Sequence, residues 1–449
     1  MGVCRARNRF VVGTICSMMV LSLVLAASPW ALAAESSAGR VPDEEAYGVT
    51  TQDGVSLALR RYQPEPGAGF EEDRQPVILM PGMLGNFNYF DIRTPPGESY
   101  CVELPDGAQV DEYIENDPMK YYSMAHFLWN QGYDVWLANY RGEGRAPYRS
   151  EGATGYSIDD VGIYDMPAII SKVYDVTGEH PVWIGHSMGS TMAYIYLEGA
   201  KYGEGKNPHV VSDEGLVAER NGTTEGPQSL KGFVDMDGPM IPMGGSLPDL
   251  AIVWLALYAP WYIELRPLLA TVGEYGAPVV GLANTVSWYI YKSLGMPNLS
   301  LLNTLYTINA SNMDSEVLKY GAEYCLDGVS TRALAQYADA VAHKAFREDY
   351  LNGGFNLMAP DPRSGDGYFY YTDNLGLISL PALVLADSTE DITSPEDIEN
   401  FYDGKTPTDL DEFFEVPNTA HIDLVMGLNG PTITFPEIAE WLDELCASD

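Results

Sequence analysis

One serine stands where a strand is expected to turn sharply into a helix. Residues 185–189 read Gly-His-Ser-Met-Gly, between the apolar run 181–184 and an amphipathic run that begins at Ser190. A serine at such a turn projects its hydroxyl above the edge of a sheet, and Gly185 and Gly189 let strand and helix approach closely. His186, the variable residue of the turn, is expected to point away from the site. The pattern indicates a nucleophilic Ser187, and the alternative is an inert serine in a structural turn.

A nucleophilic serine needs a base, and the chain has six histidines. Five of them belong to a predicted helix, to the approach to a strand, to the turn itself, or to an inserted region and its approach. His421 instead follows the last predicted strand, where a loop can return to the carboxyl edge of the sheet. Elimination and position therefore favour His421 as the base.

A carboxylate must orient the imidazole and stabilise its cation. Asp391 lies on the loop after the predicted strand at 380–387, and its rivals are Asp387, Glu390 and Asp237. The order Ser187, Asp391, His421 is the order in which this type of turn has its partners along the chain. We therefore predict Asp391 as the acid.

Two backbone donors are expected to bind the negative oxygen that develops on an attacked carbonyl. The Met188 N–H follows the nucleophile directly, and the loop Gly82-Met83-Leu84 after the apolar run 76–80 offers the Met83 N–H. One such donor is worth about 3 kcal/mol in the transition state.

These groups require a framework of alternating strands and helices. Residues 47–64 predict a hairpin with a turn at Asp53-Gly54, and short apolar strands then alternate with helical segments as far as residue 239. This alternation predicts an α/β fold, with a mostly parallel sheet and helices on both faces. Residues 240–379 break the pattern and predict a mostly helical cap, after which residues 380–449 complete the core.

The N-terminus resembles an export signal. Three arginines precede an apolar run, and Ala31-Leu32-Ala33 fits a cleavage site, so we expect residues 1–33 to be removed and a polar segment to span 34–46. This predicts a secreted or extracytoplasmic protein, and the alternative is a membrane anchor formed by an uncleaved signal. Of the cysteines beyond the signal, Cys101 and Cys325 are the expected pair and Cys446 stays single. Their spacing predicts no metal site.

The charge and composition exclude several classes of function. The chain has 63 acidic and 25 basic residues, a net charge of −38, which would repel nucleic acid and anionic membranes. Its hydrophobic fraction of 46% supports a large core and argues against disorder.

Taken together, these segments resemble the α/β-hydrolase fold superfamily, and within it the acid lipase and esterase branch. The resemblance covers about residues 47–200 and 380–445, and it does not extend to the cap. It implies Ser187, Asp391 and His421 as nucleophile, acid and base, with neutral carboxylic or lipid esters as substrates and no cofactor. Pro81-Gly82 departs from the His-Gly that is usual before the oxyanion residue of this branch.

The predicted reaction is acyl transfer through an acyl-enzyme on Ser187, with water as the final acceptor. An acyltransferase or a secreted aminopeptidase could use the same three residues, and a non-catalytic binding protein could have the same fold. A serine at the turn, rather than an aspartate, disfavours dehalogenase chemistry.

Overall fold

The computed structural model describes residues 44–64, 75–152, 155–206, 208–241, 262–266, 308–352, 367–388 and 392–448. The predicted signal segment lies outside these residues. So does much of the predicted cap, whose limits at 240 and 379 stay a prediction. None of the helices in the described ranges combines the length and apolar composition needed to cross a bilayer.

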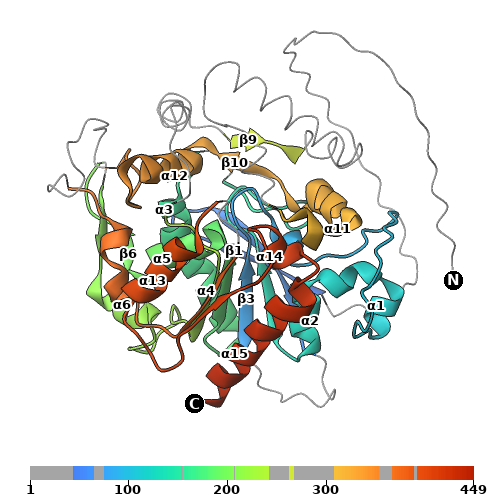
Figure 1. The fold of residues 1–449 in the computed structure, drawn as a ribbon. Helices are drawn as coiled ribbons and strands as arrows, with labels where there is room; N and C mark the ends of the chain where they lie inside the picture. Colours follow the sequence, from blue (N-terminus) through green and yellow to red (C-terminus); the bar gives the residue numbers. More distant parts are fainter. Residues whose placement is uncertain are drawn as a thin grey trace, which may run out of the picture. The chain divides into compact units, whose positions relative to one another are not determined.

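The core is one eight-stranded sheet (Figure 1). Its strands, in spatial order, are β1 (Glu44–Thr50), β2 (Ser56–Tyr62), β4 (Asp134–Ala138), β3 (Pro76–Met80), β5 (Val182–His186), β8 (Gly232–Met236), β11 (Ala382–Ala386) and β12 (Glu412–Glu415). The six strands from β4 to β12 are parallel to one another, and β2 is antiparallel to both β1 and β4. The predicted α/β fold with a mostly parallel sheet is confirmed.

The hairpin of β1 and β2 forms at the predicted turn. Thr51 N donates to Val55 O at 2.9 Å, and Gly54 takes a φ of +91°. That conformation is costly for a residue with a Cβ atom, which explains the glycine in the Asp53-Gly54 pair.

Both faces of the sheet are buried, because successive side chains of a strand point to opposite sides. In β3, Ile78 and Met80 belong to one apolar cluster, and Val77 and Leu79 belong to the other. The first cluster includes residues of the helices α4 (Met166–Thr177), α5 (Met188–Leu197) and α13 (Pro395–Gly404). The second includes residues of α2 (Met124–Asn130) and α15 (Phe435–Ala447). Burial on both faces accounts for the continuously apolar strand sequences.

The start of α3 (Ile158–Asp160) and the end of α4 lie at the capping residues that the sequence predicts. Ser157 caps α3 in a reciprocal capping box with Asp160, and a π-helical turn, η3 (Val161–Asp165), joins α3 to α4. Gly178 ends α4 in the left-handed conformation, with φ +80°. The remaining short elements outside the region 240–379 are η1 (Phe87–Tyr89), α1 (Glu112–Asn116), η2 (Pro118–Tyr122), β6 (Ala200–Tyr202), β7 (Val210–Ser212), α6 (Glu214–Arg220), α14 (Asp423–Met426) and η8 (Gly430–Thr434).

The region between β8 and β11 contributes both helices and strands to its described part. These elements are β9 (Tyr262–Glu264), η4 (Ala310–Asn312), α11 (Ser315–Tyr320), η5 (Gly321–Cys325), β10 (Gly328–Ser330), α12 (Thr331–His343), η6 (Tyr371–Asp373) and η7 (Leu375–Leu377). Strands β9 and β10 pair antiparallel, and the sequence did not predict this small ribbon. Figure 1 shows it at the top of the molecule between α12 and α11.

The predicted pairing of Cys101 with Cys325 is wrong. Cys325 is a free and fully buried thiol at the end of η5. Burial raises the pKa of the Cys325 thiol well above its usual range, so this residue behaves as a small apolar side chain.

Candidate active site

The turn between β5 and α5 brings Ser187 to the carboxyl edge of the sheet. Ser187 has φ +55° and ψ −125°, a conformation that L-residues adopt only when the surrounding structure imposes it. Its N–H donates to Met236 O of the neighbouring strand at 3.0 Å, which anchors the strained residue. The serine is 8% exposed.

The two glycines of the turn are required by packing. A Cβ atom on Gly185 would lie 2.4 Å from the Gly189 backbone, and one on Gly189 would lie 2.3 Å from Met80 O. Both distances are far shorter than real contacts, so strand, helix and the end of β3 can meet only without these side chains. The role predicted for Gly185 and Gly189 therefore has a direct structural reason.

The loop after β3, residues 82–86, lies directly against the serine, and we call it the oxyanion loop. A Cβ atom on Gly82 would lie 2.6 Å from the Cβ atom of Ser187. Across the described residues, neither the Met83 N–H nor the Met188 N–H donates a backbone or side-chain hydrogen bond. Met188 is also the first residue of α5, where the helix dipole favours negative charge. Two N–H groups at this position suit an oxyanion, and their assignment as its donors stays a prediction.

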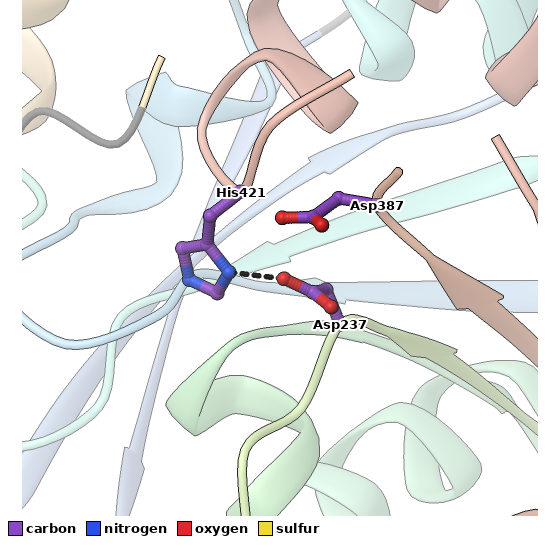
Figure 2. A group of neighbouring side chains, drawn as sticks. All are labelled: Asp237, Asp387 and His421. Carbon is purple, nitrogen blue, oxygen red and sulfur yellow. Dashed lines mark hydrogen bonds and ion pairs between the residues drawn. The ribbon is translucent and has the colours of Figure 1, made fainter. Parts of the chain in front are cut away.

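His421 is buried in the loop after β12, and a carboxylate contacts it. Its Nδ1 forms a short hydrogen bond with Oδ2 of Asp237 (Figure 2). The Tyr89 hydroxyl donates to the carbonyl of Ile422, the next residue, at 3.0 Å. Ser388 N donates to Thr419 O at 3.1 Å. These contacts hold the loop, and with it the imidazole, near the end of β11.

Asp237 reaches the imidazole from the end of β8. It has φ +56°, and its N–H donates to Leu385 O of β11 at 2.8 Å. The next residue, Gly238, donates its N–H to Oδ1 of the buried Asp235 at 2.8 Å. Asp235 therefore fixes the turn that carries Asp237.

Among the described residues, the carboxylate that bonds to His421 is that of Asp237, whereas the sequence predicts Asp391 as the acid. Asp391, the predicted acid, and its rival Glu390 lie outside the described residues, so Asp391 stays a prediction. The other two rivals, Asp237 and Asp387, both lie beside His421 (Figure 2). Asp237 directly follows a buried strand whose carboxyl end lies at the same sheet edge, and this signal could have placed it first.

His186 lies beside His421 and does not point away from the site as predicted. Its ring centroid is 4.6 Å from that of His421 and 5.0 Å from that of Tyr89, and its Nε2 donates to the His421 carbonyl at 2.9 Å. Burial, reinforced by the His421 imidazole, holds the pKa of His186 well below its usual range. The ring is therefore neutral at pH 7 and does not oppose a positive charge on His421.

The cluster of Asp237, Asp387 and His421 is also a donor set that a divalent cation could use, since one ligand atom from each residue lies within 4.8 Å of the others. The contact between His421 Nδ1 and Asp237 is, however, the contact that an imidazole makes when it transfers protons through its other nitrogen. The prediction of a metal-free site is left to experiment.

A small apolar cavity borders the His421 loop through Ile422, and residues of the region between β8 and β11 also line it. Its lining residues are Tyr89, Met313, Leu318, Gly321, Ala322, Cys325, Leu326, Ile422 and Met426. The lining is apolar, but the cavity volume of about 20 Å³ lies far below the roughly 300–1,000 Å³ of a typical ligand pocket.

Comparisons with known proteins agree with this architecture. Residues 75–214 match the family model described as alpha/beta hydrolase fold. Human lipase member K is 30% identical over 159 residues, which are 34% of this chain and 34% of that protein. Triacylglycerol lipase 2 of Arabidopsis thaliana is 22% identical over 411 residues, which are 88% of this chain and 83% of that protein.

The match to the human relative thus spans about a third of its length. Among solved structures, a soluble variant of monoglyceride lipase from Saccharomyces cerevisiae, in complex with a substrate analogue, superposes with a TM-score of 0.50 at 13% identity. The alignment covers 91% of this chain and 96% of that one. At this identity the likeness shows the fold alone.

Proposed function

We propose that this chain, which belongs to the α/β-hydrolase fold superfamily and is similar to its lipases and esterases, hydrolyses carboxylic esters through an acyl-enzyme on Ser187. The observation that carries the proposal is the placement, at one sheet edge, of a strained serine with the Gly82 loop against it and of a histidine bonded to a carboxylate.

In the proposed reaction, Ser187 Oγ attacks the ester carbonyl carbon while His421 Nε2 accepts the hydroxyl proton. Asp237 keeps the proton of His421 on Nδ1, so that the lone pair of the ring lies on Nε2, and it stabilises the imidazolium that forms. The Met83 and Met188 N–H groups bind the oxyanion. The C–O bond to the alcohol then breaks and His421 protonates the leaving alkoxide, which leaves an acyl group on Ser187.

Water completes the cycle by the same steps. His421 removes a proton from water as it attacks the acyl carbonyl, and it returns that proton to Ser187 Oγ when the acid leaves. No step uses a metal or an organic cofactor, so we expect turnover to survive treatment with EDTA.

The substrate class is proposed from the relatives of the chain, which are named as lipases. The apolar residues beside His421 agree with this, but the cavity that they line, about 20 Å³, is too small to hold an acyl chain in this structure. From the relatives we propose esters with an apolar acyl or alcohol chain, lipid esters included. The net charge of −38 favours neutral or cationic substrates over anionic ones.

We place this activity outside the cytoplasm, on the strength of the basic and apolar run at residues 1–33 and the cleavage pattern at Ala31-Leu32-Ala33. The N-terminal peptide of the protein recovered from culture medium or periplasm, read by mass spectrometry, would begin at Ala34 if the proposal is right. An intact N-terminus on membrane-bound protein would support the uncleaved anchor.

Labelling with a fluorophosphonate, followed by mass-spectrometric mapping of the adduct, tests the nucleophile. We expect one adduct, on Ser187, that a short-chain ester competes away. Ser187→Ala should lose about 10⁴-fold or more in ester turnover with no loss of folded structure. Amide analogues of active esters should be hydrolysed far more slowly, whereas an aminopeptidase would prefer the amide. Folded wild-type protein that takes no label, with and without detergent, would overturn the proposal.

A further inference from the structure

We propose that the segment Tyr324–Asp327, which lies between α11 and β10, positions the oxyanion loop, and that Asp327 is the positioning residue that anchors this segment. The inference rests on the proposed function. It assigns to the region between β8 and β11 a role in positioning an oxyanion donor.

The two segments pair along their backbones although about 240 residues separate them in sequence. Asn86 N donates to Cys325 O at 2.8 Å, and Asp327 N donates to Leu84 O at 2.7 Å. Between them, Gly85 and Leu326 form an antiparallel bridge. The oxyanion loop is thus held like an edge strand, and its partner is the 324–327 segment.

Side chains of the loop extend this pairing. Nδ2 of Asn86 and Nδ2 of Asn88 both donate to the Tyr324 carbonyl, at 2.9 Å and 3.1 Å. Leu84 has φ +70°, an unfavourable conformation for leucine, and its carbonyl is the one that Asp327 N–H binds. The 324–327 segment therefore fixes the strained residue of the loop.

The pairing affects the direction of the Met83 N–H, the proposed oxyanion donor, through the peptide that joins Gly82 to Met83. Met83 N–H shares its planar trans peptide with the Gly82 carbonyl, so the two groups point in opposite directions. That carbonyl accepts from the Gly85 N–H and from the Tyr140 hydroxyl, both at 3.1 Å. Gly85 in turn pairs with Leu326. A displacement of the 324–327 segment would move Gly85 and rotate the plane that aims the Met83 N–H.

Asp327 anchors the segment to the core. Its side chain is fully buried and accepts from Gly144 N at 2.6 Å, Arg266 Nε at 2.7 Å and Arg145 Nε at 3.3 Å. Arg145 also donates to Leu326 O at 3.2 Å. A buried ion pair contributes little net stability over apolar packing, whereas three directed contacts set the position of the segment. This is the property that an oxyanion site requires.

The test compares Asp327→Asn with Asp134→Asn. Asp134 is a matched control because it is also buried and pairs with an arginine, Arg61, at 2.8 Å and 2.7 Å, but at the start of β4 and thus at the opposite sheet edge. The readouts are kcat and KM with a p-nitrophenyl ester and the Ki of an arylboronic acid. A boronate on the serine places one oxygen in the oxyanion site, so its Ki reports on the donors.

For Asp327→Asn we expect kcat to fall about 10- to 100-fold, a part of the ~10²–10³-fold loss seen when a donor is removed outright. KM should stay within about 3-fold, and Ki should rise in parallel with the loss in kcat/KM, since the lost interaction belongs to the transition state. Asp134→Asn should lower Tm and leave kcat within about 2-fold.

Asn86→Ser provides a second variant if Asp327→Asn does not fold. Serine can still cap η1 as Asn86 does through Asn88 N, but it loses the bond to the Tyr324 carbonyl. We expect a fall in kcat of about 3- to 10-fold, with KM unchanged. Folded variants at both positions with wild-type kcat and boronate affinity, or with changes no larger than those of Asp134→Asn, would overturn the inference alone. Wild-type protein without ester turnover would overturn the proposed function and this inference together.

Discussion

The two edges of the sheet differ in the residue types that have a positive φ. Four of the five non-glycine residues with positive φ in the described part of the chain lie in loops after the carboxyl ends of strands: Leu84, Ser187, Asp237 and Asn418. At the amino edge, the helices α2 and α4 lead into β4 and β5, and the left-handed positions there are taken by Gly132 and Gly178. In the loops directly after β3, β5, β8 and β12, the positive-φ positions are therefore taken by residues with side chains, whereas the loop after β4 uses Gly142 and Gly144.

This contrast has an energetic meaning. A left-handed L-residue costs about 1–2 kcal/mol, a cost that glycine avoids. At the carboxyl edge the cost is offset by bonds that continue the sheet: Ser187 N–H to Met236 O, and Asp237 N–H to Leu385 O. Strain that the surrounding structure imposes in this way is characteristic of functional sites.

Replacing the carboxylate of the carboxyl edge should have the largest effect. In Asp237→Asn, the amide can donate to His421 Nδ1 and so favour the tautomer with the proton on Nε2, which cannot accept the serine proton. We expect kcat to fall about 10⁴-fold, measured with a p-nitrophenyl ester, while the far-UV circular dichroism stays native.

Asp387→Asn and Asp391→Asn complete this series. If Asp237 is the acid, both should retain at least a hundredfold more activity than Asp237→Asn. A loss at Asp391 that exceeds the loss at Asp237 would instead establish the acid that the sequence predicted.

Stability of the carboxyl edge should depend on pH through Asp235. Burial raises the pKa of Asp235 to about 7, from an unfolded value near 4. The folded protein therefore holds a proton that the unfolded chain releases, and the stabilisation present below pH 4 is lost as pH rises through 7. Asp235→Asn removes this titration. Relative to the variant, the free energy of unfolding of the wild type should fall by roughly 4 kcal/mol between pH 4 and pH 8.

Urea unfolding of both proteins at several pH values measures this difference. Asp134→Asn at the amino edge is the control, because its carboxylate pairs with Arg61. A constant difference between wild type and Asp235→Asn across the range would show that Asp235 is ionised throughout.

Local features of the fold could be predicted from the sequence, and long-range contacts could not. The turn around Ser187, the hairpin at Asp53-Gly54 and the cap at Ser157 each depend on a few consecutive residues. The choice among the acids depends on which of several loops reaches His421, and no local pattern decides that. The pairing of the oxyanion loop with residues 324–327 likewise joins segments that are far apart in sequence.

The error at His186 has a simple geometric origin. As the last residue of β5, it shares a face with Val182 and Ile184, whose side chains lie in the second apolar cluster. That orientation turns it from the Ser187 hydroxyl but toward the loop of His421, which packs on the same face. Alternation along the strand predicts the direction, and only the tertiary structure shows what lies there.

The smallest predicted effect tests the strain itself. Ser187→Gly and Ser187→Ala both remove the nucleophile, but only glycine also removes the Cβ atom that φ +55° disfavours. The free energy of unfolding of Ser187→Gly should therefore be about 1 kcal/mol higher than that of Ser187→Ala. At the amino edge, Gly178→Ala should lose about 1 kcal/mol, since φ +80° suits only the glycine already present. Equal free energies of unfolding for the two Ser187 variants would mean that the backbone at Ser187 stores no strain. The contrast between the two edges of the sheet would then have no energetic basis at this residue.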